Sequence, residues 1–236
     1  MYQLSPKGRQ VQEMFGAIAP RYDFLNRLLS FGVDQRWRRK AVRQLRFNEG
    51  GKVLDIATGT GDLALTIAAS TPPTLSIIGI DFSPEMVAIG REKVARSPHR
   101  DRINLEVAPC EAIPFSDATF DSVSIAFGIR NVVDRSLGLR EMFRVLKPSG
   151  KVVILEFATP RSRLFRAIYH FYFHRLLPPI AGLFSNYSAY RYLPESVEDF
   201  PSRPEFCRLM EQAGFTNVTC QELTFGIATI YCGDHP

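Results

Sequence analysis

The stretch Asp55-Ile-Ala-Thr-Gly-Thr-Gly-Asp62 decides the fold of this 236-residue chain. An apolar run at Lys52–Ala57 reads as a short strand, and Asp62–Ala69 reads as the helix that follows it. Gly59 and Gly61 between them let the backbone turn tightly and approach a ligand closely. A strand, a glycine turn and a helix in this order predict the nucleoside-binding start of a doubly wound parallel sheet.

Strand-like and helix-like segments alternate along the rest of the chain, which is the pattern of an α/β protein. Ser83 with Pro84 predicts a helix start, because serine caps helices and proline suits their first turn. The further predicted strands are Leu75–Ile80, Ile103–Val107, Asp121–Ala126, Lys151–Phe157, Asn217–Leu223 and Ile227–Cys232. The further predicted helices are Ser136–Leu146, before a turn at Lys147–Gly150, and Pro204–Ala213.

The last two predicted strands are separated only by Thr224, Phe225 and Gly226, so they should pair as an antiparallel hairpin. A mostly parallel, seven-stranded, Rossmann-like sheet closed by such a hairpin is characteristic of class I methyltransferases. We therefore expect one domain over residues 1–236. It would carry a helical N-terminal cap at 1–48 and an aromatic-rich helical insertion at 160–195, where nine Phe/Tyr occur.

Composition narrows the class of protein. Hydrophobic residues make up 45% and charged residues 22%, as in an ordinary globular protein. No apolar run approaches the roughly 20 residues that span a bilayer, and the first residues lack a signal-peptide core, so we expect a cytoplasmic protein. The cysteines are far apart, which argues against a metal site and a disulfide framework; they are Cys110, Cys207, Cys220 and Cys232.

The net charge of +5 is unevenly placed. Residues 1–48 hold ten Lys/Arg and three Asp/Glu, a balance of +7, which leaves −2 for the rest of the chain. The basic cluster Arg36–Lys40 contributes most of this excess. Such a segment can meet nucleic acid, an anionic membrane surface or an acidic ligand, or can be a solvated helix face.

Two cofactors fit the glycine turn. Gly59, Gly61 and Ala64 satisfy a relaxed dinucleotide fingerprint, and Asp81 lies at the expected distance for a ribose. Three features favour S-adenosylmethionine (SAM) over a nicotinamide cofactor. A carboxylate at Asp55 suits a cationic methionyl end, and the hairpin belongs to methyltransferase topology. Asp62 would also place a negative charge where a pyrophosphate needs a free helix N-terminus.

The remaining expected contacts to SAM follow from this placement. Asp81 should accept hydrogen bonds from the ribose hydroxyls, and Thr60 lies inside the turn itself. The segment Ala108–Phe115 leaves the third strand and should run along the adenine. Pro109 offers no N–H and no side-chain acceptor, so we expect a polar contact from the backbone N–H of Cys110 or from elsewhere.

Several segments resemble the C-methyltransferases of ubiquinone and menaquinone biosynthesis. The resemblance covers nearly the whole chain, and its first two segments are far more specific than the glycine turn. The segments are Tyr22–Gly32 with Arg36–Arg38, Phe127–Val132, Arg144–Gly150 with Leu155–Phe157, Tyr190–Ser196 and Ala213–Phe215. Ser149 stands where the family usually has glycine, a mild change within a turn.

The resemblance implies SAM-dependent methylation of a ring carbon in a polyprenylated quinol. Arg130 and Asn131 follow the fourth strand, at the edge where ligands gather in such sheets. We hypothesise that Arg130 stabilises the developing phenolate and that Asn131 orients the quinol or a proton-accepting water. The alternative is a structural pair that caps the loop.

The resemblance does not decide whether the acceptor ring is a naphthoquinol or a methoxy-benzoquinol. The overall likeness of the sequence to those of menaquinone-making bacteria favours demethylmenaquinol. A lipid substrate implies transient contact with the inner face of the cytoplasmic membrane. A homodimer is compatible with this function. The rival classes are a nucleic-acid methyltransferase and a non-catalytic SAM-binding module. We expect no nucleic-acid partner, because the Asn/Asp-Pro-Pro-Tyr/Phe signature of amino-group methylation is missing and Phe127–Val132 occupies its place. His170 and His174 share a helix face without a further ligand, so we expect no metal. Their aromatic stretch reads as a wall of the ring pocket or as ordinary core.

Overall fold

The structure is a computed structural model that describes residues 5–30, 32–160, 162, 175 and 187–236. Its strands form one sheet in the order β3-β2-β1-β4-β5-β7-β6. Strands β1 to β5 run parallel to one another, and β7 runs antiparallel to both β5 and β6. The strands are β1 (Lys52–Ile56), β2 (Ser76–Asp81), β3 (Ile103–Val107), β4 (Phe120–Ala126), β5 (Leu146–Phe157), β6 (Thr216–Leu223) and β7 (Ala228–Asp234). The expected mostly parallel sheet with a closing antiparallel hairpin is confirmed.

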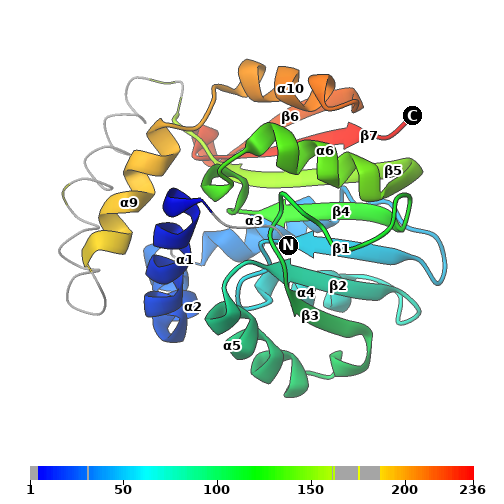
Figure 1. Ribbon diagram of the computed structural model, residues 1–236, viewed down its shortest axis with the longest axis horizontal. Coiled ribbons are helices and arrows are strands. Elements are labelled where there is room, and N and C mark those ends of the chain that lie inside the picture. Colours follow the sequence, from blue (N-terminus) through cyan, green and yellow to red (C-terminus); the bar gives the residue numbers. More distant parts are fainter. Residues whose placement is uncertain (1–4, 31, 161, 163–174, 176–186) are drawn as a thin grey trace.

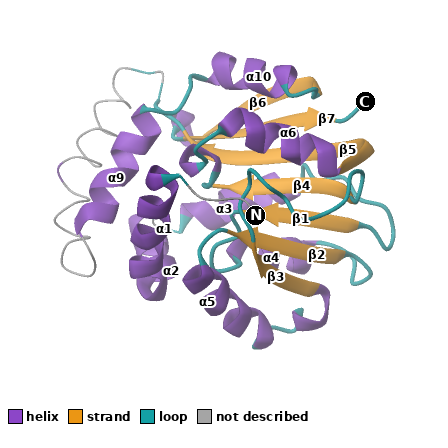
Figure 2. Cartoon of the chain, viewed as in Figure 1, coloured by secondary structure: helices purple, strands orange, loops and turns teal. Residues whose placement is uncertain are grey.

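Helices cover both faces of this sheet (Figures 1 and 2). The α-helices are α1 (Pro6–Ile18), α2 (Tyr22–Leu29), α3 (Val33–Val42), α4 (Asp62–Ser70), α5 (Pro84–Ala95), α6 (Arg135–Val145), α9 (Tyr187–Glu198) and α10 (Arg203–Gln212). Helices α6 and α10 pack on one face, and α3, α4 and α5 pack on the other. Helices α1, α2 and α9 lie beside the carboxyl ends of the parallel strands (Figure 1). None of the helices within the described residues is long and apolar enough to cross a membrane.

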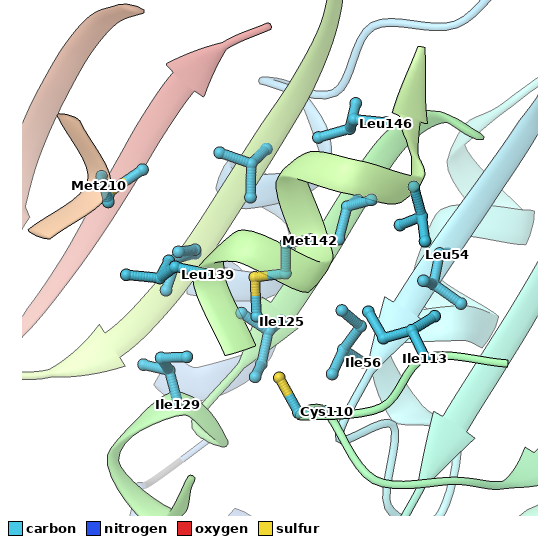
Figure 3. Packing of buried hydrophobic residues seen from close by; sticks show 14 of the residues in the cluster. Leu54, Ile56, Cys110, Ile113, Ile125, Ile129, Leu139, Met142, Leu146 and Met210 are labelled. Carbon is cyan, nitrogen blue, oxygen red and sulfur yellow. The ribbon is translucent and has the colours of Figure 1, made fainter. Parts of the chain in front are cut away.

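The core follows from the period of two along each strand. In β1, Leu54 and Ile56 point toward α6, where they join Leu139 and Met142 (Figure 3). Val53, one residue before Leu54, packs on the opposite face against α4. Since a fully buried aliphatic side chain contributes about 1.5–3 kcal/mol, these side chains hold a helical layer against each face of the sheet.

Local signals set where the helices begin. The Ser83 hydroxyl accepts from the backbone N–H of Met86 at 3.3 Å, so the expected cap of α5 is present. Asp134 caps α6 in the same way, accepting from Leu137 at 2.8 Å. The turn expected before the fifth strand lies inside β5, where Ser149 has φ 63°. A serine therefore adopts the left-handed conformation that glycine adopts at no steric cost.

The structure describes the expected N-terminal cap but only part of the expected insertion. Helices α1, α2 and α3 lie within the expected cap at 1–48. Most of the aromatic-rich segment 160–195, including His170 and His174, lies outside the described residues. Its expected role as a ring-pocket wall stays a prediction.

Candidate active site

The glycine turn is tied to the end of β2 through Asp81. Gly59 and Gly61 have φ values of 56° and 82°, which a side chain would strain. The N–H of Gly59 donates to Oδ2 of Asp81 at 2.9 Å, and the N–H of Ser83 donates to Oδ1 at 2.9 Å. Burial raises the pKa of Asp81 to about 6. Because each carboxylate oxygen carries a second lone pair, Asp81 keeps acceptor capacity for ribose hydroxyls.

Asp55 is fully buried at the end of β1. The hydroxyls of Thr58 and Ser124 donate to its two oxygens at 2.6 Å and 3.1 Å. Burial raises the pKa of Asp55 to about 7, although these hydrogen bonds and the charge of Arg38 act in the opposite direction. Asp55 therefore holds the turn in shape. A direct approach of its carboxylate to a methionyl group stays a prediction.

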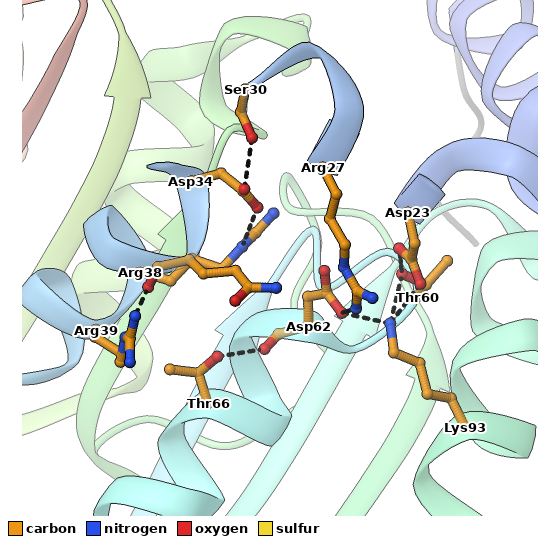
Figure 4. A network of polar contacts seen from close by, with 11 residues as sticks. Asp23, Arg27, Ser30, Asp34, Arg38, Arg39, Thr60, Asp62, Thr66 and Lys93 are labelled. Carbon is orange, nitrogen blue, oxygen red and sulfur yellow. Dashed lines mark hydrogen bonds and ion pairs between the residues drawn. The ribbon is translucent and has the colours of Figure 1, made fainter. Parts of the chain in front are cut away.

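A cluster of charges links the N-terminal cap to the glycine turn (Figure 4). The Lys93 ammonium of α5 contacts the carboxylates of Asp62 and Asp23, and Arg27 lies 3.9 Å from Asp62. Burial works against ionisation of Asp62, but Lys93, Arg38 and Arg27 together outweigh it and lower the pKa of that carboxyl. Asp23 also accepts from the Thr60 hydroxyl at 2.5 Å.

This cluster corrects one argument from the sequence. Asp62 stands in the first turn of α4, as expected, but Lys93 and Arg27 neutralise its charge. Its repulsion of a pyrophosphate is therefore weaker than a lone carboxylate would give. The Thr60 hydroxyl donates to Asp23 of the cap and accepts from Lys93, and a contact of Thr60 with the cofactor stays a prediction.

On the adenine side, Pro109 is half-buried and the Cys110 thiol points into the core (Figure 3). Burial raises the pKa of Cys110 well above its ordinary value, so the thiol stays protonated. The sequence missed Glu111, whose carboxylate accepts from the N–H of Val133 at 3.1 Å. Glu111 thereby joins the exit of β3 to the segment after β4.

Arg130 is buried in a network of hydrogen bonds after β4. Its Nη1 donates to the carbonyl of Phe127 at 2.6 Å and to Oε1 of Glu156 at 2.7 Å. Its Nε donates to the hydroxyl of Ser196 at 3.3 Å. These contacts fasten the short helix η3 (Ile129–Asn131) to β5 and α9, as the structural alternative requires. A catalytic role for Arg130 stays a prediction.

Asn131 has an acceptor to spare. Its Oδ1 is buried and has no hydrogen-bond donor among the described residues. A Cβ on Gly128 would lie 2.4 Å from the Cβ of Ala57, so the segment that carries Asn131 passes directly over the end of β1. An unpaired buried acceptor is costly unless a ligand or water completes it.

Three aromatic rings pack together next to these residues. The ring centroids of Phe127 and Phe157 lie 4.5 Å apart. The Trp37 ring lies 6.2 Å from that of Phe127 and 6.1 Å from that of Phe157. The guanidinium of Arg130 lies 5.4 Å from the Phe157 ring centroid. From the sequence we expected an aromatic wall of the ring pocket in the segment 160–195. The aromatic residues Phe127 and Phe157 at the exits of β4 and β5 could also have been predicted to line the site.

Tyr22, the first residue of α2, completes the cap side of the site. Burial raises the pKa of its phenol, although the charges of Arg130 and Arg38 lower it. The phenol therefore lies within electrostatic reach of both arginines. Helix α2 also contacts the glycine turn, because Asp23 accepts from the Thr60 hydroxyl.

Comparison with known proteins decides which family this geometry belongs to. The model of the ubiE/COQ5 methyltransferase family matches residues 3–235. The chain belongs to the ubiE/COQ5 methyltransferase family. It is therefore a SAM-dependent C-methyltransferase, and the cofactor expected from the glycine turn is confirmed.

Individual members of the ubiE/COQ5 family are similar over nearly their full length. The chain is 66% identical over 234 residues to the ubiquinone/menaquinone biosynthesis C-methyltransferase UbiE of Geobacter sulfurreducens, covering 99% of this chain and 91% of that one. It is 50% identical over 224 residues to the demethylmenaquinone methyltransferase of Thermus thermophilus, covering 94% and 100%.

Solved structures support the fold. A SAM-dependent methyltransferase from Aquifex aeolicus superposes with a TM-score of 0.63 over 84% of this chain and 89% of its own, at 20% identity. The donor side of the ubiE/COQ5 site fits SAM on its own evidence, because Asp81 retains acceptor capacity beside a side-chain-free glycine turn.

Proposed function

We propose that the chain methylates a ring carbon of demethylmenaquinol and so forms menaquinol. The observation that carries this proposal is the buried, unpaired Oδ1 of Asn131 on a segment that crosses the donor turn. An acceptor atom there suits a ring hydroxyl. The aromatic rings of Phe127 and Phe157 suit the flat faces of a quinol.

The reduced ring is the proposed substrate because of the chemistry at carbon. An aromatic carbon is a weak nucleophile until a neighbouring hydroxyl loses its proton and pushes charge into the ring. SAM supplies an electrophilic methyl group on sulfur. The protein then has to hold the ring carbon in line at about 3 Å, which is chiefly a positioning task.

Asn131 is proposed to receive the ring hydroxyl through Oδ1, or to hold a water that takes its proton. Arg130 holds this segment through its ion pair with Glu156. Because Glu156 offsets part of its charge, Arg130 exerts a weaker positive field at the ring. The Asn131→Ala variant should lower turnover without weakening SAM binding. Asn104→Ala, on the exposed edge of β3, is the matched control.

The choice of ring rests on relatives. The Thermus thermophilus relative is named for demethylmenaquinone, whereas the Geobacter sulfurreducens relative is named for both quinone pathways. The second candidate is therefore C-methylation of a methoxy-polyprenyl-benzoquinol, by the same site. Reduced lipid extracts from cells lacking either methylation, incubated with methyl-labelled SAM, separate the two. Label in the naphthoquinol supports the proposal, and label only in the benzoquinol replaces it.

A polyprenyl tail keeps the substrate in the bilayer, so we propose peripheral contact of the protein with the membrane. Phe225 is 66% exposed in the turn η5 (Thr224–Gly226) between β6 and β7. The indole N–H of Trp37 donates to Thr224 at 2.9 Å, which ties this turn to α3. The exposed face of α3 is basic and carries Arg36, Arg39 and Lys40, and the exposed Arg43 follows directly after the helix. An apolar ring beside cations suits an anionic lipid surface.

A further inference from the structure

The basic cluster of α3 is divided into an exposed and a buried part. Arg36, Arg39 and Lys40 are exposed, whereas Trp37 and Arg38 are buried. Arg38 is only 7% exposed. The sequence reading of this cluster as one surface patch is therefore wrong for Arg38, and its charge needs a separate explanation.

Arg38 is poorly paired for a buried cation. Its Nε lies 3.6 Å from Oδ2 of Asp34, and neither atom has a hydrogen-bond partner in the described part of the chain. The other oxygen of Asp34 accepts from the Ser30 hydroxyl at 2.6 Å (Figure 4). Arginine stays charged in proteins and brings five N–H donors, so a buried guanidinium in this state is costly.

The position of Arg38 relates it to the methyl-donor turn. Its guanidinium lies 5.2 Å from the ring centroid of Phe127, at the exit of β4. Its charge lowers the pKa of Asp55 at the end of β1 and of Asp62 at the start of α4. Asp81, at the ribose end, owes its pKa shift to burial and to hydrogen bonds from Ser83 and Gly59. Arg38 thus lies on the side of the site formed by the exits of β1 and β4.

We propose that Arg38 binds the α-carboxylate of SAM. With the ribose at β2, the methionyl end of the donor extends toward β1 and β4, where Arg38 is buried. A guanidinium matches a carboxylate with two parallel N–H donors, and this charge-assisted pair satisfies the donors that Asp34 leaves open. The proposal requires only the SAM dependence of the family, not the identity of the quinol.

The test compares SAM with decarboxylated SAM, which keeps the sulfonium and the nucleoside but has no carboxylate. Calorimetry on the wild-type protein should show at least tenfold tighter binding of SAM. In Arg38→Gln, SAM binding should weaken on the order of 10–100-fold while decarboxylated SAM changes by no more than about twofold. Arg39→Gln is the matched control, because Arg39 is exposed, follows Arg38 directly and donates to the Gln35 carbonyl of its own helix.

Several results would overturn the proposal. One is a wild-type protein that binds both ligands equally, which needs no variant to fold. Another is an Arg38→Gln variant that keeps the wild-type preference for SAM. A third is unchanged SAM binding with an altered pH profile of methylation, because Arg38 would then serve the acceptor phenolate. Should Arg38→Gln not fold, Arg38→Lys keeps the charge but loses the fork, and it should give an intermediate preference.

Discussion

Nη1 of Arg130 lies 2.7 Å from Oε1 of Glu156, and both side chains are buried. The pair joins the segment after β4 to the end of β5. Glu156 also accepts from the backbone N–H of Arg130 at 3.2 Å. The buried charge pair is thus one of the contacts that hold the segment after β4, and variants of this pair can test its effects on stability and on turnover separately.

Arg130→Ala should lower the free energy of unfolding by about 3–5 kcal/mol, because it leaves Glu156 buried without its cation. Urea unfolding measures this loss. The double variant Arg130→Met/Glu156→Gln removes both charges and should recover most of it.

The same double variant tests the catalytic role of Arg130. If Arg130 also stabilises the phenolate, turnover stays low although stability and SAM affinity have recovered. Full recovery of turnover would leave Arg130 with a structural role alone.

The stability of the ligand-free protein should fall as pH rises from about 4 to about 7. Burial raises the pKa of Asp55 to about 7 and of Asp81 to about 6, so the folded chain binds protons that the unfolded chain has released. Carboxyls with lowered pKa, such as Asp62, lose their contribution only below this window. Unfolding at several pH values measures the slope, and Asp55→Asn should flatten it. A stability that rises through the window would contradict burial of these carboxyls.

Lys93→Met should loosen the cap over the glycine turn. Asp23 and Asp62 would face each other without the ammonium that lies between them. We expect a loss of about 1–2 kcal/mol in unfolding free energy and faster dissociation of SAM in stopped-flow experiments. Arg96→Met, which removes an exposed pair with Glu92, is the control and should change stability by less than about 0.5 kcal/mol. Equal effects of the two variants would argue against a special role for Lys93.

Binding to anionic liposomes should depend on α3 and η5. Replacing Arg36, Arg39 and Lys40 with Gln should weaken sedimentation with the liposomes at least tenfold, since each cation near such a surface contributes about 1 kcal/mol. Phe225→Ser should weaken it further, and added salt should weaken it in the wild type. Gln at the exposed Arg96 and Arg100, outside α3, is the matched control. A wild-type protein that does not sediment with the liposomes at low salt would contradict membrane binding through α3 and η5.

The donor turn was predictable because its signals are local. An apolar run, two glycines and Asp81 lie within one β–α–β unit, and their hydrogen bonds join neighbours in that unit. The partner of Arg130 was not assigned, because Glu156 is 26 residues away. A sheet order with β4 beside β5 would have pointed to it, since parallel neighbours end at the same edge.

The burial of Arg38 shows why a count of charges is a poor guide to the exposure of α3. Five charged residues in ten suggested a solvated helix, yet the buried positions recur at helical spacing. These positions are Asp34, Trp37, Arg38, Ala41 and Val42. The pattern i, i+3, i+4, i+7, i+8 marks a buried face, so periodicity was the signal that net charge obscured.

The most direct measurement gives purified protein and SAM to demethylmenaquinone in its reduced and its oxidised form. Mass spectrometry and NMR then locate any new methyl group. We expect a methyl on the ring carbon of the reduced form and none on the oxidised form. A methyl on a ring oxygen, or no methylation of the reduced ring, would contradict methylation at a carbon of the quinol.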